Sequence, residues 1–154
     1  MVSQVHHSPN DDSRLSLMAE IASDAVLDEA CQWLCRWRRD ASPNDDVWSL
    51  RLHWADVKLR LQQQLMAGGY RCGPTRRVQT SGGIFELWSA EDALVLKATA
   101  IVLRRELDPV LSPRCFHLSG RGGLKAAVRE VDAVRVGQKF VFRTDVRSYY
   151  ARIV

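Results

Sequence analysis

The spacing of apolar residues changes near Tyr70, and this change limits the folds that the chain can adopt. Before Tyr70, apolar residues recur at intervals of three and four, which is the pattern of amphipathic helices. After it, short segments are bracketed by glycine, proline and serine, as strands of a hairpin are. The sequence therefore predicts an α+β protein with a helical N-terminal region and a small β-hairpin.

The first helix is predicted to begin at Ser23, because serine is a favourable N-cap, and to end at Arg38 and Arg39. Its stripe consists of Leu27, Ala30, Cys31, Leu34 and Trp37. Residues 1–22 precede it, and their first part is polar and has no apolar period. We therefore predict a disordered tail over residues 1–22.

The second helix is predicted to run unbroken from a cap at Asp45 or Asp46 to the glycine pair Gly68-Gly69. Its stripe consists of Val47, Leu50, Trp54, Val57, Leu61 and Leu65. The two strands of the hairpin are expected at residues 76–79 and 84–88.

A capping box formed by Ser89 and Asp92 predicts a third helix over residues 93–107. That helix is apolar on nearly every side, so we expect it to be buried. A fourth helix follows Gly122-Gly123 and closes at Gly137. Its expected inward residues are Leu124, Ala127, Val128, Val131 and Val134.

The segment 139–146 alternates apolar and polar residues, which predicts a strand. Asp145 shares one face of this strand with Arg143 and Arg147. Taken alone, a carboxylate between two arginines is usually a surface ion pair. Tyr149 and Tyr150 follow at four and five positions after it.

Charge is distributed unevenly along the chain. Residues 1–70 contain 7 Lys and Arg against 10 Asp and Glu, whereas residues 71–154 contain 15 against 8. A basic half of this kind favours a polyanionic partner, with nucleic acid first and an acidic membrane surface second. No apolar run approaches the length of a membrane helix, and the N-terminus lacks the pattern of a signal peptide. We expect a cytoplasmic protein without a membrane partner.

The four cysteines are Cys31, Cys35, Cys72 and Cys115. No CxxC pair or histidine at metal-type spacing accompanies them, so the sequence predicts free thiols and not a zinc site. His117 has no identifiable base or nucleophile partner, and no catalytic role is expected for it.

Three stretches of the chain are similar to one protein family in order and spacing. They are LMAGGYRCGPTRR (65–77), ELWSAEDALVLKATAIVL (86–103), and SGRGGLKAAVREV followed by KFVFRTDVRSYYARI (119–131 and 139–153). Together they resemble the N-terminal part of a bacterial reverse transcriptase of the group II intron and retron type. The last stretch resembles polymerase motif A, beginning near Phe142, and is the most specific of the three.

The resemblance implies the fingers and the start of the palm of a polymerase right-hand fold. In this interpretation residues 23–137 form a helical and fingers-like region, and residues 138–154 form the first, truncated part of the palm. The implied activity of the full-length enzyme is RNA-directed DNA polymerisation. Its partners would be an RNA template, a DNA primer and an incoming deoxynucleoside triphosphate.

The resemblance also assigns the site residues. Asp145 would be the catalytic carboxylate and a Mg²⁺ ligand, with the backbone carbonyl of Val146 as a second contact. Nucleotide addition requires such groups, because two divalent ions stabilise the attacking and leaving oxygens. Tyr150 would lie under the incoming sugar, and Arg76 and Arg77 would contact the triphosphate or the template backbone.

Further nucleic-acid contacts are expected from Trp88, Arg121 and Lys125. Trp88 is the last residue of the second expected strand, where an aromatic ring can stack on a base. Arg121 lies within the glycine-rich turn 120–123 at a helix start, and Lys125 follows it. A phosphate can bind at such a place, although a glycine cluster of this kind is more often a simple connection.

The chain departs from the family in several places. Residues 84–87 are Ile-Phe-Glu-Leu where relatives carry Arg-Pro-Leu, and Ala151 replaces an acidic residue. The second catalytic element, an aromatic residue followed by two aspartates, does not follow Asp145 in this sequence. We therefore expect a fragment that does not polymerise by itself. The alternative is a standalone basic RNA- or DNA-binding protein without catalysis.

Overall fold

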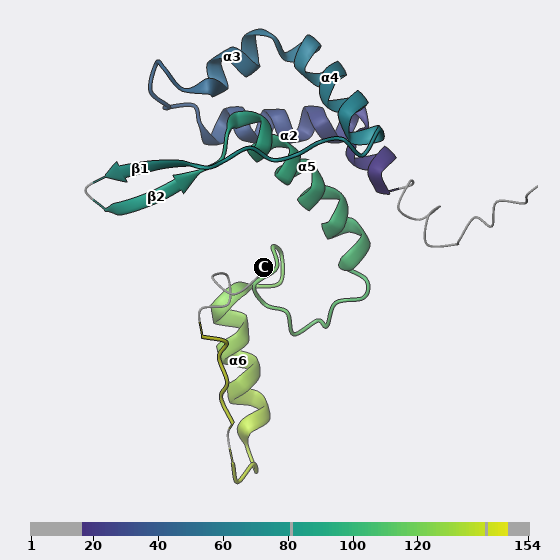
Figure 1. Ribbon diagram of the computed structural model, residues 1–154. Helices are drawn as coiled ribbons and strands as arrows, with labels where there is room; N and C mark the ends of the chain where they lie inside the picture. The colour runs from purple at the N-terminus through teal and green to yellow at the C-terminus, as the bar shows by residue number, and fades with distance from the viewer. Residues whose placement is uncertain (1–16, 81, 141, 148–154) are drawn as a thin grey trace, which may run out of the picture. The chain divides into compact units, whose positions relative to one another are not determined.

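The computed structural model describes residues 17–80, 82–140 and 142–147 of the chain (Figure 1). It is mostly helical, with one small antiparallel β-hairpin. The chain divides into two compact units, residues 1–109 and residues 110–154, and each is described below by itself. The boundary after Pro109 lies well before residue 138, where the sequence predicted the start of a palm region.

The α2 helix (Asp24–Trp37) begins at the predicted N-cap, where the Ser23 side chain accepts a hydrogen bond from the backbone N–H of Val26. Its predicted stripe is confirmed except at its end: Leu27, Ala30, Cys31 and Leu34 are buried, whereas Trp37 is 62% exposed.

Regular structure begins before the α2 helix. Residues 17–21 are helical, and Ile21 and Ala22 belong to the core, although residues 1–22 were predicted to be a tail. Residues 1–16 lie outside the described part of the chain.

The predicted second helix is two helices. The α3 helix (Asp46–Leu52) and the α4 helix (Trp54–Met66) meet at His53, whose backbone leaves the helical range at φ −105° and ψ 25°. An unbroken helix over this stretch would be about 30 Å long, against about 21 Å for α2. The break lets both halves cover the same core, and α3 and α4 form an arch over α2 (Figure 1).

The hairpin is confirmed at the predicted place. The β1 strand (Arg76–Thr80) pairs antiparallel with the β2 strand (Gly83–Leu87), with Arg77 opposite Glu86 and Val78 opposite Phe85. Ile84 and Phe85 are exposed, because no other described strand or helix covers this two-stranded sheet. The hairpin is therefore held to its unit at its base.

The α5 helix (Ala90–Leu107) begins with the predicted capping box, in which the Ser89 side chain accepts a hydrogen bond from the backbone N–H of Asp92. It packs mainly on α2. The expectation of burial on nearly every side is wrong, because Leu96, Leu103 and Leu107 are exposed. Only one face of α5 meets other helices, so leucines on its remaining face stay in solvent. The packed face contributes Leu94, Val95, Ala98, Ile101 and Val102 to the core.

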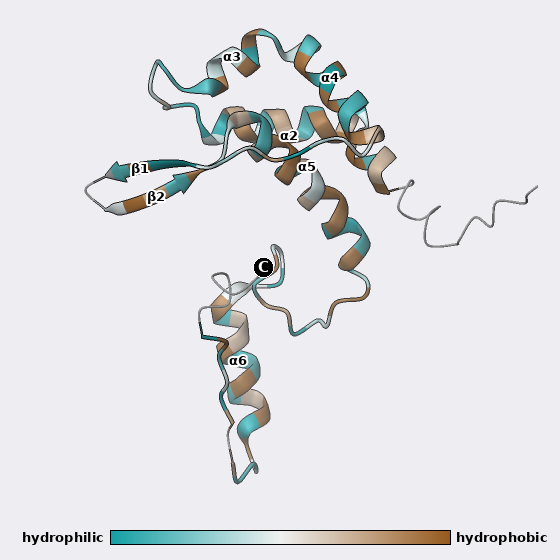
Figure 2. Ribbon diagram, in the orientation of Figure 1, coloured by the Kyte–Doolittle hydropathy of each residue, from teal (hydrophilic) through white to brown (hydrophobic). Residues whose placement is uncertain are grey.

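The second unit contains the α6 helix (Gly123–Arg135), at the place predicted from the sequence. Its N-cap Gly122 has φ +81°, and a Cβ there would lie 2.6 Å from the Cβ of Ala126, so glycine is required. The predicted inward residues are not buried: Leu124, Val128, Val131 and Val134 are all exposed. Figure 2 shows apolar residues along this helix. The described part of the second unit has no buried residue against which they could pack.

The predicted strand over residues 139–146 does not form in the described residues 139, 140 and 142–147. A strand needs a neighbour to pair its backbone groups, and the hairpin is the only sheet in the described part of the chain. Phe140 and Phe142 are almost fully exposed as a result. None of the helices in the described residues is long and apolar enough to cross a membrane.

A buried carboxylate joins the end of α4 to the start of α5. Asp92 accepts hydrogen bonds from the Tyr70 hydroxyl at 2.7 Å, the Ser89 hydroxyl at 2.7 Å and the Gly73 N–H at 3.1 Å. Burial alone would raise the pKa of Asp92, but these hydrogen bonds outweigh it and hold the pKa below its ordinary value. Burial, and then the hydrogen bond to Asp92, raises the pKa of Tyr70. The capping residue predicted from the sequence is therefore also an internal anchor.

This anchor predicts how stability changes with pH. A carboxyl group with a depressed pKa stabilises the fold above its unfolded pKa of about 3.9, and the contribution is lost as the pH falls through the folded pKa. Asp92→Asn should lower the free energy of unfolding by about 2 kcal/mol at neutral pH, because an amide cannot accept all three hydrogen bonds. Urea unfolding at neutral pH and near pH 3 should show this difference shrinking in acid. An equal difference at both pH values would contradict the role given to the ionised carboxylate.

Candidate nucleic-acid interface

The base of the hairpin is held by the guanidinium of Arg38. This group donates hydrogen bonds to Asp45 at 3.2 Å, to Asp46 at 2.9 Å and to the backbone carbonyl of Trp88 at 2.7 Å. Asp46 also accepts a hydrogen bond from the N–H of Ala90 at 2.7 Å. The end of α2, the start of α3 and the junction between β2 and α5 thus meet at one side chain.

Burial would raise the pKa of Asp45, but the hydrogen bond from the N–H of Val47 and the charge of Arg38 outweigh it and lower that pKa. The carboxylate is therefore ionised at neutral pH, which matches a buried arginine. Arg38 is only 9% exposed. This cluster fixes the direction in which the hairpin leaves the helices.

Arg76 and Trp88, two of the predicted site residues, lie at the same place. Both line an open hollow of about 240 Å³ at the base of the hairpin, together with Asn44, Asp46, Pro74, Leu87 and Ser89. Arg76 is largely exposed, and its guanidinium nitrogen Nη2 lies 3.6 Å from the carboxylate oxygen Oδ2 of Asp45. Trp88 is 42% exposed, so an aromatic side chain and a cation lie beside the same hollow. This pairing suits a base and its phosphate.

Arg77 is not part of this hollow. Neighbouring residues of a strand point to opposite faces, and Arg77 lies opposite Glu86, to which its guanidinium is paired at 3.4 Å. The hairpin therefore presents Arg76 and Arg77 on different faces. One ligand group cannot readily contact both of them on this hairpin.

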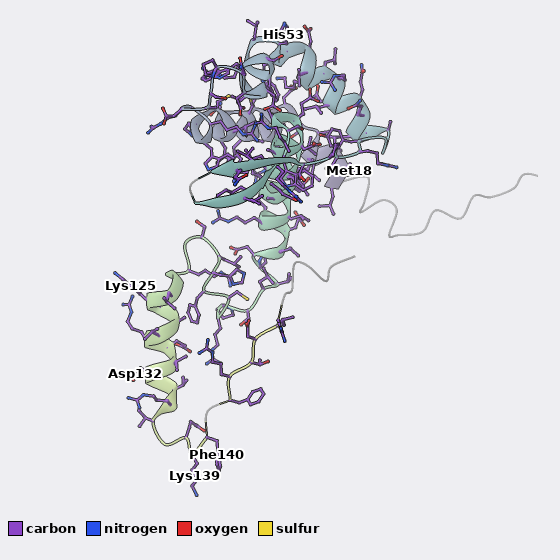
Figure 3. The ribbon with its side chains drawn as sticks, turned by 60° about the vertical axis from the view of Figure 1, so that its left-hand side comes forward. Met18, His53, Lys125, Asp132, Lys139 and Phe140 are labelled. Atoms are coloured by element: carbon purple, nitrogen blue, oxygen red, sulfur yellow. The ribbon has the colours of Figure 1, made fainter. Side chains whose placement is uncertain are left out.

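Arg121 and Lys125 belong to the second unit. The guanidinium of Arg121 donates to the backbone carbonyls of Leu111 and Ser112, which ties it to the loop before α6. Lys125 is exposed on the first turns of α6, on the same side as Asp132 (Figure 3). Lys139 and Phe140 lie beyond the C-terminal end of the helix in the same view.

The basic charge of the chain resides in this second unit. From residue 110 onward the sequence has 9 Lys and Arg against 3 Asp and Glu, a net charge of +6, whereas residues 1–109 have 13 against 15, a net charge of −2. A phosphate backbone would therefore be attracted mainly by the second unit.

Asp145 and Val146 are exposed in the segment after α6. Tyr150, the predicted contact of the sugar, lies outside the described residues. Among the described residues, no group of three or more His, Cys, Asp or Glu side chains is arranged to hold a metal ion. The structure thus leaves the metal assignment of Asp145 as a prediction.

Two features of this surface are not predicted by the local sequence patterns. Arg38 is predicted from the sequence only as the end of a helix, although the acidic pair Asp45-Asp46 follows it by seven and eight residues and could indicate an ion pair. Trp37 was assigned to the core stripe, although the basic residues around it indicate a helix end in solvent.

No protein-family model matches the chain, and a search of curated proteins also finds no match.

The hollow beside the hairpin predicts a specific loss of binding. Trp88→Ala should weaken the binding of single-stranded oligonucleotides about tenfold, because stacking on an aromatic ring contributes about 1–3 kcal/mol for each base. Arg76→Ala should weaken binding. It should also reduce the slope of log affinity against log salt concentration by about one, because one phosphate contact is lost. Fluorescence anisotropy at several salt concentrations measures both effects.

Arg51→Ala is a matched control, because Arg51 is also an exposed arginine beside a tryptophan. It lies on α3, and its guanidinium carbon is 5.1 Å from the ring centroid of Trp48. Its affinity should equal that of the unmodified protein. Equal losses in Arg51→Ala and Arg76→Ala would show that the hollow has no special part in binding.

Proposed function

We propose that this chain forms the fingers hairpin and the approach to the palm of an RNA-directed DNA polymerase of the group II intron and retron type. The observation that supports this best is the order of elements. A helix ending near Gly68-Gly69 leads into a basic antiparallel hairpin, which leads into a capped long helix. The same order is implied by the three stretches that resemble the family.

The hairpin supports the nucleic-acid part of this proposal. Arg76 and Trp88 share a hollow, and the cluster around Arg38 fixes their position. A rigid base under a projecting hairpin suits a segment that must hold a template and a triphosphate in register. Arg77, on the other face, would contact a different part of the nucleic acid.

In this proposal Asp145 supplies one carboxylate of the catalytic centre. Magnesium prefers carboxylate and carbonyl oxygens, and Asp145 with the carbonyl of Val146 has the right chemistry for part of a site. A single exposed carboxylate does not make a complete site, and the described residues contain no group of three or more His, Cys, Asp or Glu side chains that could hold a metal ion. The remaining ligands would have to come from a palm segment with an aromatic-Asp-Asp element. Tyr150 would then select the sugar.

A second function is favoured by the charge distribution. The second unit has a net charge of +6, and its α6 helix exposes basic residues. A protein of this kind can bind RNA or DNA through phosphates without any catalysis. In that case Asp145 would be an ordinary surface carboxylate.

Nucleotide addition separates the two functions. The chain alone should not extend a DNA primer on an RNA template. When it is joined to a palm segment carrying the aromatic-Asp-Asp element, extension should require Mg²⁺. Asp145→Ala should then reduce the rate more than about a hundredfold, since even the partners of metal ligands contribute about 10–100-fold. Template–primer binding should persist in this variant.

Asp132→Ala is the control, because Asp132 is an exposed aspartate of the same unit, paired with Arg135 at 2.7 Å. This variant should extend the primer at the unmodified rate. Full activity in Asp145→Ala would exclude the metal-ligand role.

A further inference from the structure

Two tryptophans on successive turns of α2 stack on one another. The ring centroids of Trp33 and Trp37 are 5.6 Å apart, and the ring planes differ by 10°. Trp33 packs against the core, whereas Trp37 is 62% exposed. Trp37 is held by Trp33, and it contributes much less than a buried tryptophan would to the stability of the fold.

Cations surround this aromatic pair. The ammonium of Lys97, which comes from α5, lies 4.9 Å from the ring centroid of Trp33. The guanidinium carbon of Arg38 lies 5.9 Å from the ring centroid of Trp37. Trp37 itself stands within the run Arg36-Trp37-Arg38-Arg39, in which Arg36 and Arg39 are exposed. An exposed aromatic ring among cations fits a ligand that has both a π face and negative charge.

Lys97 also lines a hollow beside α2 and α5. The hollow has a volume of about 370 Å³. The other residues that line it are Glu29, Ala100, Ile101, Arg104, Arg105, Asp108 and Pro109. Arg105 forms ion pairs with Glu20 and Glu29, whereas the ammonium of Lys97 lies over the indole ring of Trp33. Lys97 can therefore turn toward a phosphate without breaking one of these ion pairs.

We propose that this face of α2 and α5 binds single-stranded nucleic acid, with an unpaired base stacked on Trp37 and a neighbouring phosphate against Lys97. Single strands suit it because their bases are free to stack, and because stacking on an aromatic ring tolerates any sequence. A purely apolar protein partner would gain nothing from the cations around the ring. Its residues differ from those that line the hairpin hollow, and the proposal does not depend on polymerase activity.

Anisotropy of a labelled oligothymidylate with the full chain tests the proposal. Trp37→Ala should weaken binding about tenfold or more, and Trp37→Phe should retain most of the affinity because a phenyl ring still stacks. Lys97→Gln should weaken binding and reduce its salt dependence. The exposure of Trp37 means that its replacement leaves the core intact.

Trp48→Phe is the matched control. Trp48 also lies beside an arginine, but it is half-buried, and its indole N–H donates to the carbonyl of Ser42. Trp48→Phe should bind as the unmodified protein does. Unchanged affinity in Trp37→Ala overturns the proposal, and so does an equal loss in Trp48→Phe. Asp145→Ala should leave this binding unchanged, so failure of the polymerase proposal would be seen separately.

Discussion

The buried guanidinium of Arg38 is the interaction on which the first unit depends. It bonds to two carboxylates at the start of α3 and to the carbonyl of Trp88 before α5, so it joins two successive helices to a residue 50 positions further along the chain. Removing one partner of such a buried group costs about 3–5 kcal/mol, because the remaining charges lose their compensation. The same contact fixes the hairpin and gives Trp88 and Arg76 a constant relative position.

The two units differ in how they are stabilised, and this difference bears on function. The first has a core contributed by α2, α3, α4 and α5, and its polar anchors at Arg38 and Asp92 are satisfied. The second exposes the apolar residues of α6 and of the segment around Phe140 and Phe142. Exposed apolar surface of this kind usually meets another surface. In the polymerase proposal the rest of the palm provides it.

Local patterns in the sequence predicted the elements that depend on nearby residues. Ser23 and Ser89 marked helix starts correctly, and the glycine clusters bracketed the hairpin. The break at His53 was missed because no glycine or proline marks it, and it follows from the length of the helix beneath. The inward face of α6 and the strand around Asp145 were wrong for the described residues, because periodicity predicts a face or a strand but not the neighbour that must cover it. Arg38 and the exposed ring of Trp37 needed tertiary structure to be recognised.

We propose that Asp145 belongs to the first strand of a polymerase palm. The most direct test is to sequence the DNA that follows the Val154 codon and to translate it in all three frames. We expect an aromatic residue followed by two aspartates, within a segment that can pair with residues 139–146. If no frame contains such an element, the palm assignment is contradicted, and Asp145 is left without a catalytic role.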